Sequence, residues 1–318
     1  MSSKFLNITH ADIDGAACSI LLKKFYGAEN VETVPIAFNR ADDACTKAID
    51  KWAKNYKAVF VTDVYPSAEI AAKFDDTNIY MFDHHDSGIP KSKHCMIIPK
   101  KECSAALVVA SKVNGMKNLS KEMKQLVYLT TDYDSYQLND ERSRQLNLLY
   151  FGKYNFDEYI DRFTDGFDGF TNSEKTYIKN VEKEIKLIKA EVPEKMWCWN
   201  LGGYKVSACT IYQHMNDITD HMFELEPTTD IALVLRLDKR RGSLRLRATE
   251  KNDIHEDLDF KMMDYVEKVI KAKGGGHKFS GGFTWSEKDE FERKPNFILD
   301  FRKWDAKLGK DNFYKENK

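Results

Sequence analysis

Short apolar runs alternate with amphipathic stretches over the first half of the chain. Strands are predicted over residues 4–9, 31–37, 57–62 and 78–82, and helices over 16–25, 40–55, 104–110 and 120–131. The predicted strands are rich in apolar and β-branched residues, which is typical of strands covered on both faces. Strands that alternate with helices indicate a mostly parallel sheet with helices on both faces. We therefore expect an α/β fold for this part of the chain.

The pattern changes character in the second half. Short helices are expected over 141–170, and residues 173–191 place apolar side chains at helical spacing until Pro193 ends the helix. Strand-like runs then follow at 196–200, 204–208, 230–237 and 243–247, with a last helix at 264–273. A chain of 318 residues is long enough for two domains. We expect a first domain over 1–172, a linking helix over 173–192 and a smaller α/β domain over 193–318.

Carboxylates and imidazoles follow three of the predicted strands. The first strand leads into His10, Asp12 and Asp14, the third ends in Asp63, and the fourth ends in Asp83-His84-His85. Taken singly, each has an ordinary explanation as a helix cap, a turn residue or the start of a loop. The carboxyl ends of parallel strands meet at one edge of a sheet, however, and both side-chain types coordinate first-row metals. The pattern favours a shared metal site.

Three further segments carry candidate chemistry. The helix over 120–131 runs into Asp132 and Asp134, which are either turn residues or a fourth acidic contribution. The strand at 243–247 alternates strictly, which places Arg245 and Arg247 on one face. This face is either exposed to solvent or, if it faces a cleft, forms an anion clamp. Five glycines surround His277-Lys278 between residues 274 and 282; this run is predicted to form a turn whose amides line a phosphate or nucleotide pocket.

Composition narrows the function classes. The net charge of −1 leaves no global basic field for gripping long nucleic acid, so any contact with a nucleotide must be local. The six scattered cysteines favour reduced thiols in the cytoplasm over a disulfide framework. The sequence shows no run long enough to cross a membrane and no signal-peptide pattern at its start.

Together these residues resemble the DHH phosphoesterase family, in the branch that carries the DHH-associated C-terminal domain. The similarity extends over nearly the whole chain. Its motifs are His10-x-Asp12-x-Asp14-Gly15, Asp63, Asp83-His84-His85, the cluster at Asp132, and Gly274-Gly275-Gly276-His277 preceded by Ser243-Leu244-Arg245. The resemblance implies a site for two Mn²⁺ ions, or Mg²⁺, in a cleft between two domains.

The resemblance also implies a role for each residue. The expected metal ligands are His10 and Asp12 on one ion, Asp14, His84 and Asp132 on the other, and Asp63 bridging both. Asp134 offers a second carboxylate in the fourth motif, where Asp132 is favoured. His85 is expected near the scissile phosphate, with Asp83 orienting the histidines. The expected substrate-binding residues are Ser243, Arg245, Gly275, Gly276, His277 and Lys278, with Arg247 assisting.

The function implied is hydrolysis of short oligonucleotides to nucleoside 5′-monophosphates, as in the nanoRNases of the family. Cleavage of cyclic or linear dinucleotides, or dephosphorylation of 3′-phosphoadenosine 5′-phosphate, is the alternative. A different class, an inactive nucleotide-binding regulatory protein, would have lost at least one ligand. The expected partner is the short oligonucleotide or dinucleotide substrate; a homodimer is left open, and no protein partner or membrane is expected.

Overall fold

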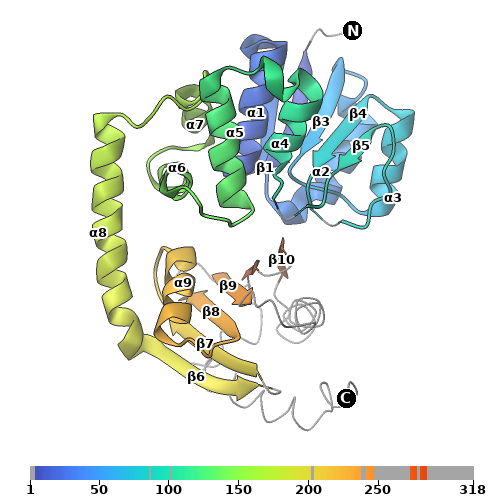
Figure 1. The fold of residues 1–318 in the computed structure, drawn as a ribbon. Coiled ribbons are helices and arrows are strands. Elements are labelled where there is room, and N and C mark those ends of the chain that lie inside the picture. Colours follow the sequence, from blue (N-terminus) through green and yellow to red (C-terminus); the bar gives the residue numbers. More distant parts are fainter. Residues whose placement is uncertain are drawn as a thin grey trace. The chain divides into compact units, whose positions relative to one another are not determined.

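The computed structural model describes residues 4–85, 87–100, 102–201, 204–237, 241–246, 273–277 and 280–284. The chain divides into two compact units, residues 1–181 and 182–318 (Figure 1). The division falls inside the helix that was expected to link two domains. Each unit has its own sheet.

The first unit is built on a sheet in which every strand pair is parallel. The strand order is β2-β1-β3-β4-β5. The strands are β1 (Phe5–His10), β2 (Val31–Ile36), β3 (Ala58–Thr62), β4 (Ile79–Asp83) and β5 (Cys95–Ile97). The first four confirm the predicted strands. The short β5 was not expected, because a strand of three residues is too short to carry a periodic signal.

Alternating side chains of these strands fill two separate hydrophobic cores. Phe5 and Phe60 face one core, whereas Leu6 and Val59 face the other. The first core is covered by α1 (Ile13–Tyr26), α4 (Ala105–Val109), α5 (Lys121–Asp134), α6 (Glu141–Gly152) and α7 (Phe156–Arg162). The second is covered by α2 (Ala41–Lys47) and α3 (Ala68–Ala71). Burial on both faces confirms the predicted α/β arrangement and explains why the strands read as continuous apolar runs.

Several expected helices are shorter than predicted or change their winding. The segment expected as one helix over 40–55 is a 3₁₀ turn, then α2, then a π-helical turn, Ala48–Trp52. The helix α4 likewise passes into a π-helical turn, Ala110–Asn114. The 3₁₀ turn before α2 is Phe38–Arg40, and the other 3₁₀ segments of the first unit are Ala28–Asn30, Ala72–Asp76 and Met116–Asn118. Apolar spacing alone does not distinguish these windings.

The second unit contains a mixed sheet in the order β10-β11-β9-β8-β7-β6. Its elements are β6 (Met196–Leu201), β7 (Tyr204–Thr210), α9 (Met215–Leu225), β8 (Ile231–Arg236), β9 (Arg241–Leu246), β10 (Lys273–His277) and β11 (Ser280–Thr284). Only the pair β7–β8 is parallel; the other pairs are antiparallel. The helix expected over 264–273 lies outside the described residues except for Lys273, which begins β10.

One helix, α8 (Asn172–Lys195), belongs to both units. Ile178 lies in the first core of the first unit, whereas Val192 lies in the core of the second unit with Ile211 and Ile218. Pro193 was expected to end this helix, but the helix continues two residues further. Because proline has no amide hydrogen, one backbone hydrogen bond of the helix is missing at this position.

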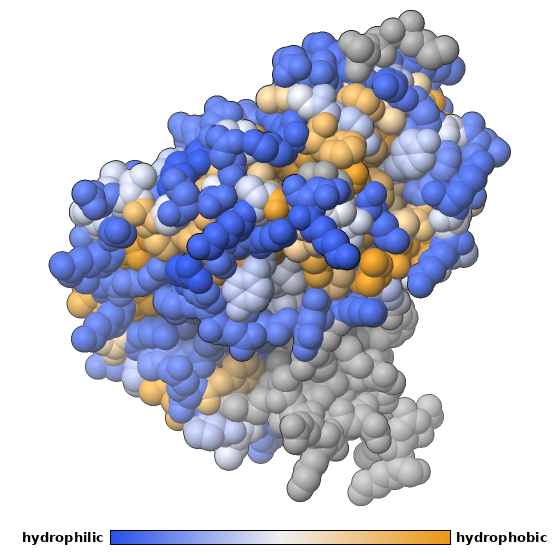
Figure 2. Space-filling view, turned by 45° about the horizontal axis from the view of Figure 1, so that its top comes forward, coloured by the Kyte–Doolittle hydropathy of each residue, from blue (hydrophilic) through white to orange (hydrophobic). Residues whose placement is uncertain are grey.

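The hydropathy of the surface and the state of the cysteines also bear on what the sequence predicts. Hydrophilic side chains predominate on the face shown in Figure 2, with hydrophobic residues scattered between them. Among the described residues, no helix combines the length and the apolar character needed to cross a membrane. All six cysteines are free thiols.

A buried ion pair fastens the start of α8 to α7. Glu174 is fully buried and accepts hydrogen bonds from Arg162 Nε (2.8 Å), the Tyr154 hydroxyl (2.8 Å) and the Thr171 amide (2.6 Å). Burial by itself would raise the pKa of Glu174, but these donors outweigh burial and lower it. Because the folded-state pKa is depressed, this stabilisation is present above the ordinary glutamate pKa and is lost as the pH falls through the folded value.

We predict that Glu174→Ala lowers the free energy of unfolding by on the order of 3 kcal/mol, because it leaves the Arg162 guanidinium without its buried partner. Urea denaturation at neutral pH measures this difference, which should shrink in acid. Glu194→Ala, an exposed position on the same helix, is the control and should change stability by less than about 0.5 kcal/mol. Equal effects of the two substitutions would contradict the assignment.

Candidate metal centre

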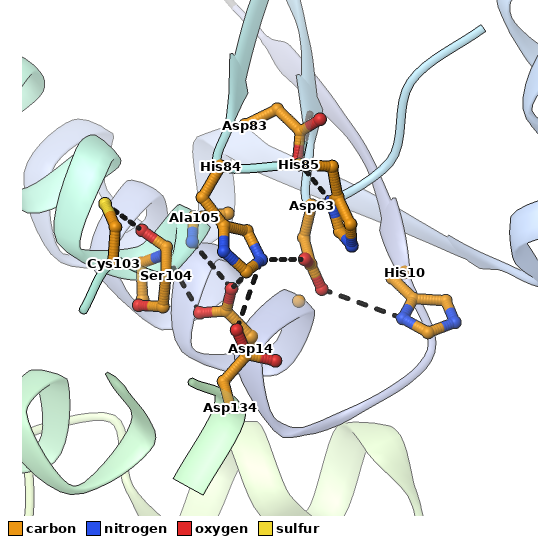
Figure 3. Close-up of polar contacts among 12 residues, drawn as sticks. His10, Asp14, Asp63, Asp83, His84, His85, Cys103, Ser104, Ala105 and Asp134 are labelled. Atoms are coloured by element: carbon orange, nitrogen blue, oxygen red, sulfur yellow. Dashed lines mark hydrogen bonds and ion pairs between the residues drawn. The ribbon is translucent and has the colours of Figure 1, made fainter. Parts of the chain in front are cut away.

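The adjacent strands β1, β3 and β4 end at one edge of the first sheet, and each contributes to a polar cluster there. His10 is the last residue of β1, Asp63 follows β3, and Asp83, His84 and His85 stand at the end of β4. Figure 3 shows these side chains converging with Asp14 and Asp134. The structure thus brings together residues that are far apart in the sequence, as the strand-end pattern predicts.

Asp12 caps α1, which is the ordinary explanation that the sequence offered, and it also contacts His10. Its Oδ1 caps α1 by accepting the amides of Asp14 (3.1 Å) and Gly15 (3.0 Å). Its Oδ2 lies 2.6 Å from His10 Nδ1. The helix therefore starts very close to the end of β1: a Cβ on Gly15 would lie 2.0 Å from the His10 carbonyl oxygen. Only glycine permits this approach.

Asp14 is fully buried and is held by the start of α4. Its two carboxylate oxygens accept the amides of Ala105 (2.7 Å) and Ala106 (2.9 Å). Ser104 caps α4 and hydrogen-bonds the Thr131 hydroxyl of α5 at 2.9 Å (Figure 3 shows Ser104 beside Asp14). These contacts fix the Asp14 carboxylate relative to α5, the helix that carries Asp134.

His84 lies at the centre of one half of the cluster. Its Nε2 is 3.1 Å from Asp134 Oδ2, 3.5 Å from Asp63 Oδ1 and 3.9 Å from Asp14 Oδ2. In Figure 3 these groups lie on one side of Asp63, and His10 lies on the other side. Asp14, His84 and Asp134 therefore form one candidate ligand group.

Asp63 connects this half to the other. Its Oδ2 lies 3.7 Å from His10 Nδ1, and it forms a second candidate group with His10 and Asp12. A third candidate group joins it to Asp83, His84 and His85. The Asp63 backbone has φ 56°, the left-handed region that non-glycine residues rarely adopt. Such strain is found where the surrounding structure imposes it, often at functional sites.

The fourth acidic segment differs from the prediction, because the structure brings Asp134 and not Asp132 to the cluster. The Asp132 carboxylate is buried and accepts the amides of Asn139 (2.9 Å) and Asp140 (3.1 Å). It thereby holds the turn after α5, which contains left-handed residues at Tyr136 and Leu138. The structure therefore places Asp134, the second carboxylate of this motif, in a candidate ligand group with Asp14 and His84, where Asp132 was expected.

His85 and Asp83 form a pair of their own. His85 Nδ1 lies 2.8 Å from Asp83 Oδ1, and Asp83 is fully buried. A carboxylate that accepts from Nδ1–H fixes the imidazole tautomer and leaves Nε2 for other contacts. The geometry agrees with the expected orienting role of Asp83 for His85; the expected catalytic role of His85 stays a prediction.

The cluster concentrates negative charge away from water. Burial raises the pKa of Asp63 and that of Asp134 well above the ordinary value, and neighbouring carboxylates raise both further. Burial also raises the pKa of Asp14. Burial lowers the pKa of His10, but Asp12 and then Asp63 more than reverse this and raise it to about 11. These shifts disfavour the simultaneous ionisation of all the carboxylates in the cluster.

The donor set fits divalent cations. Within the described residues, three buried carboxylate oxygens form no hydrogen bond: Asp63 Oδ2, Asp83 Oδ2 and Asp134 Oδ2. Buried anionic oxygens of this kind are costly unless a cation or proton compensates them. Mixed carboxylate and imidazole ligation suits Mn²⁺ and related first-row ions.

The expected substrate-binding residues lie in the second unit, on neighbouring strands. Arg245 of β9 pairs in register with Ser280 of β11, which pairs with His277 of β10. In the same way, Ser243 of β9 pairs with Gly282 of β11, which pairs with Gly275 of β10. Gly276 of β10 pairs with Gly281 of β11. The glycines at 274–276 and 281–282 therefore lie in two paired strands, and the residues between His277 and Ser280 lie outside the described residues. Lys278 and Arg247 lie outside the described residues.

Arg245 has a partner that the sequence did not indicate. Its side chain is buried, and Nη1 donates to Asp220 Oδ1 of α9 at 2.7 Å. The contact joins residues 25 positions apart, and the helix α9 itself was not predicted. The hydrogen bonds between Asp14 and the start of α4 were not predicted either, because they also join residues far apart in the sequence. The only hint in the sequence was the predicted helix of small residues at 104–110, which could pack close to the sheet.

No protein-family model and no curated protein matches the sequence. Several solved structures are similar. The pGpG-specific phosphodiesterase PggH from Vibrio cholerae has a TM-score of 0.57 and 16% identity, covering 97% of this chain and 100% of that one. The DHH domain of a member of the s1p family of ribosomal proteins has a TM-score of 0.60 and 13% identity, covering 95% and 86%.

RecJ from Thermus thermophilus in complex with Mn²⁺ has a TM-score of 0.54 and 11% identity. The match covers 96% of this chain and 52% of that one. At these identities the similarity shows the fold, and the chain has the fold of DHH-domain proteins. The structural resemblance expected from the motifs is thus confirmed.

We predict that Asp134→Asn weakens Mn²⁺ binding by at least about tenfold, because it removes a carboxylate from the candidate group around His84. Asp132→Asn is the matched control: it should loosen the turn at Asn139 and lower stability while leaving Mn²⁺ affinity within about threefold of the unsubstituted protein. The measurement is the Mn²⁺ concentration at which the melting temperature rises. The reverse ranking of the two variants would restore Asp132 as the ligand.

We predict that Gly15→Ala both destabilises the first unit, by about 1–3 kcal/mol, and weakens Mn²⁺ binding, because α1 must move away from the His10 carbonyl and carry Asp12 and Asp14 with it. Chemical denaturation and the same metal titration measure the two effects. Gly152→Ala in α6, whose added methyl meets only the flexible Tyr177 side chain, should leave metal affinity unchanged. Normal Mn²⁺ affinity in Gly15→Ala would refute this coupling.

Proposed function

We propose that this chain is a metal-dependent phosphodiesterase of the DHH phosphoesterase family that hydrolyses short linear oligonucleotides, dinucleotides included, to nucleoside 5′-monophosphates. The observation that carries the proposal is the buried cluster at the sheet edge. Its carboxylates and imidazoles lie within ligand distance of one another in overlapping groups that share Asp63 or His84. A cluster so rich in buried anionic oxygens is suited to divalent cations and thereby to phosphate chemistry.

The residues divide into two ligand sets. His10, Asp12 and Asp63 would hold one cation, and Asp14, Asp63, His84 and Asp134 the other. When bound, a pair of divalent cations lowers the pKa of a water molecule and neutralises charge on a phosphate. Mn²⁺ is the proposed ion, with Mg²⁺ as the alternative; the similar RecJ of Thermus thermophilus has been solved with each.

His85 is proposed to act on the phosphate itself. Its Nδ1 is engaged by buried Asp83 at 2.8 Å, so Nε2 is the nitrogen that can meet a substrate oxygen. A positioned imidazole can donate a hydrogen bond to a phosphate oxygen and a proton to a leaving oxygen. Asp83 would keep the ring oriented for this contact.

The second unit is proposed to recognise the rest of the substrate. Arg245 and His277 lie in one cross-strand row, and the adjacent strand places glycines at Gly281 and Gly282. A guanidinium fork matches phosphate geometry, and a strand surface without side chains permits close approach of a ligand. Asp220 supports this arrangement by holding Arg245 from the helix side.

A short substrate is favoured over long nucleic acid. The net charge of −1 provides no extended basic surface. The chain also matches the whole length of PggH, a phosphodiesterase specific for the dinucleotide pGpG, but only about half of the Thermus RecJ chain. A cyclic dinucleotide and 3′-phosphoadenosine 5′-phosphate are the alternative substrates, and an inactive nucleotide-binding protein is the alternative class.

The test is hydrolysis by the full chain with Mn²⁺. We expect mononucleotides from a pentaribonucleotide and from a linear dinucleotide, with less product from the alternative substrates. Asp63→Asn should lower turnover by at least about 100-fold, because it removes the charge shared by both ligand sets. Asparagine also tolerates the left-handed backbone at this position, so the fold is expected to persist, which circular dichroism checks.

Two results would contradict the proposal. Hydrolysis that persists in a chelator, or that is unchanged in Asp63→Asn, would exclude the metal cluster as the active site. Binding of nucleotides without any hydrolysis, unaltered by Mn²⁺, would favour the inactive nucleotide-binding protein.

A further inference from the structure

Two aromatic side chains stand beside the metal centre without belonging to it. Phe38 begins the 3₁₀ turn that follows β2, and Tyr65 lies in the loop after β3. Because β2, β1 and β3 are neighbours in the sheet, both loops leave the same edge that carries His10 and Asp63. Neither aromatic residue was singled out by the sequence, since isolated rings in polar loops are common.

The rings form a continuous aromatic group with the imidazoles. Phe38 and Tyr65 meet edge to face, with ring centroids 4.9 Å apart. The His85 ring lies 5.6 Å from each of them, and the His10 ring lies 6.3 Å from Phe38. The group therefore reaches from one ligand of the proposed metal site to the residue proposed to meet the phosphate.

Phe38 is not explained by core packing. Tyr65 packs against the core beneath α2 and α3, but Phe38 takes part in neither of the two cores described for the first unit. It is partly exposed, and its sequence neighbours Ala37 and Asn39 are exposed. An apolar ring left partly in water beside a highly charged cluster loses the gain from full burial. That arrangement is expected where a ligand covers the ring.

The chemistry of the site indicates which ligand this is. A substrate phosphate at the cluster brings its attached nucleoside within reach of the neighbouring loops. Aromatic side chains stack on nucleobases with little dependence on base identity, because every base has a π-face. Stacking here would let the enzyme bind nucleotides in preference to other phosphodiesters without reading a sequence.

We propose that Phe38, supported edge-on by Tyr65, is the stacking surface for the nucleobase of the nucleotide held at the metal centre. The inference rests on the proposed function, since it takes the ligand to be a nucleotide. Its alternative is that the two rings merely pack against His10 and His85 and keep them in place. The two roles differ in one respect: only stacking distinguishes a ligand with a base from one without.

The test compares ligands that differ only in the base. A linear diribonucleotide and its analogue lacking one base are assayed with Mn²⁺, and binding of a nucleoside 5′-monophosphate and of ribose 5-phosphate is measured by calorimetry. Phe38→Leu should weaken binding of the nucleotide, and raise KM for the dinucleotide, by about 10-fold while changing the values for the base-free ligands less than about twofold. Phe38→Trp should restore the discrimination.

Phe25→Leu is the matched control, because Phe25 is 44% exposed and lies near the opposite end of α1 from Asp14. It should leave all these values unchanged. Equal losses for ligands with and without a base in Phe38→Leu would overturn the inference and assign the rings to packing.

Failure of the inference can be told apart from failure of the proposed function. If hydrolysis occurs but Phe38→Leu still distinguishes ligands with a base from ligands without one as well as the unsubstituted protein does, the stacking surface is refuted. The proposed phosphodiesterase activity then stands. If no substrate is cleaved but nucleotide binding still falls about 10-fold in Phe38→Leu, the stacking surface stands and the phosphodiesterase fails. If nucleotide and ribose phosphate bind equally to the unsubstituted protein, the stacking surface is refuted.

Discussion

Mutual repulsion among buried carboxylates is the constraint on which the first unit depends. Asp14 and Asp63 are almost fully buried at one sheet edge, with Asp134 close by. Like charges in a low-dielectric setting are unfavourable unless protons or cations compensate them. The fold keeps them together through contacts outside the cluster: backbone amides hold Asp14, and a left-handed backbone turns Asp63 inward. The crowded carboxylates thus destabilise the fold at this edge. The two hydrophobic cores on either side of the sheet offset this cost.

The strand-end part of this site was predictable because it follows from local patterns. A buried parallel strand has a recognisable sequence, and its carboxyl end is known once the strand is known. His10, Asp63 and His84 were therefore expected to meet, and they do. The strand-like runs predicted at 196–200 and 204–208 are also present, as the antiparallel pair of β6 and β7.

Other parts depended on contacts that no local pattern encodes. Asp132 and Asp134 are two positions apart on a helix, so their side chains point about 200° apart, and only the docking of α5 decides which faces the sheet. The glycine run from Gly274 has strong turn propensity, yet it forms a strand because β11 pairs with it. Asp220 reaches Arg245 only through the packing of α9 on the second sheet. In each case a tertiary partner overrode or completed the local preference.

The shared helix α8 has a consequence for how the protein can be divided. Its apolar stripe begins at Ile178 in one core and ends at Val192 in the other, while the two units separate between residues 181 and 182. A fragment cut at that division would end within a helical turn and leave part of the stripe without its core. Short helical segments are marginal in water without such packing. In a fragment of either unit prepared on its own, we therefore expect the part of Asn172–Lys195 whose core is missing to lose its helical order.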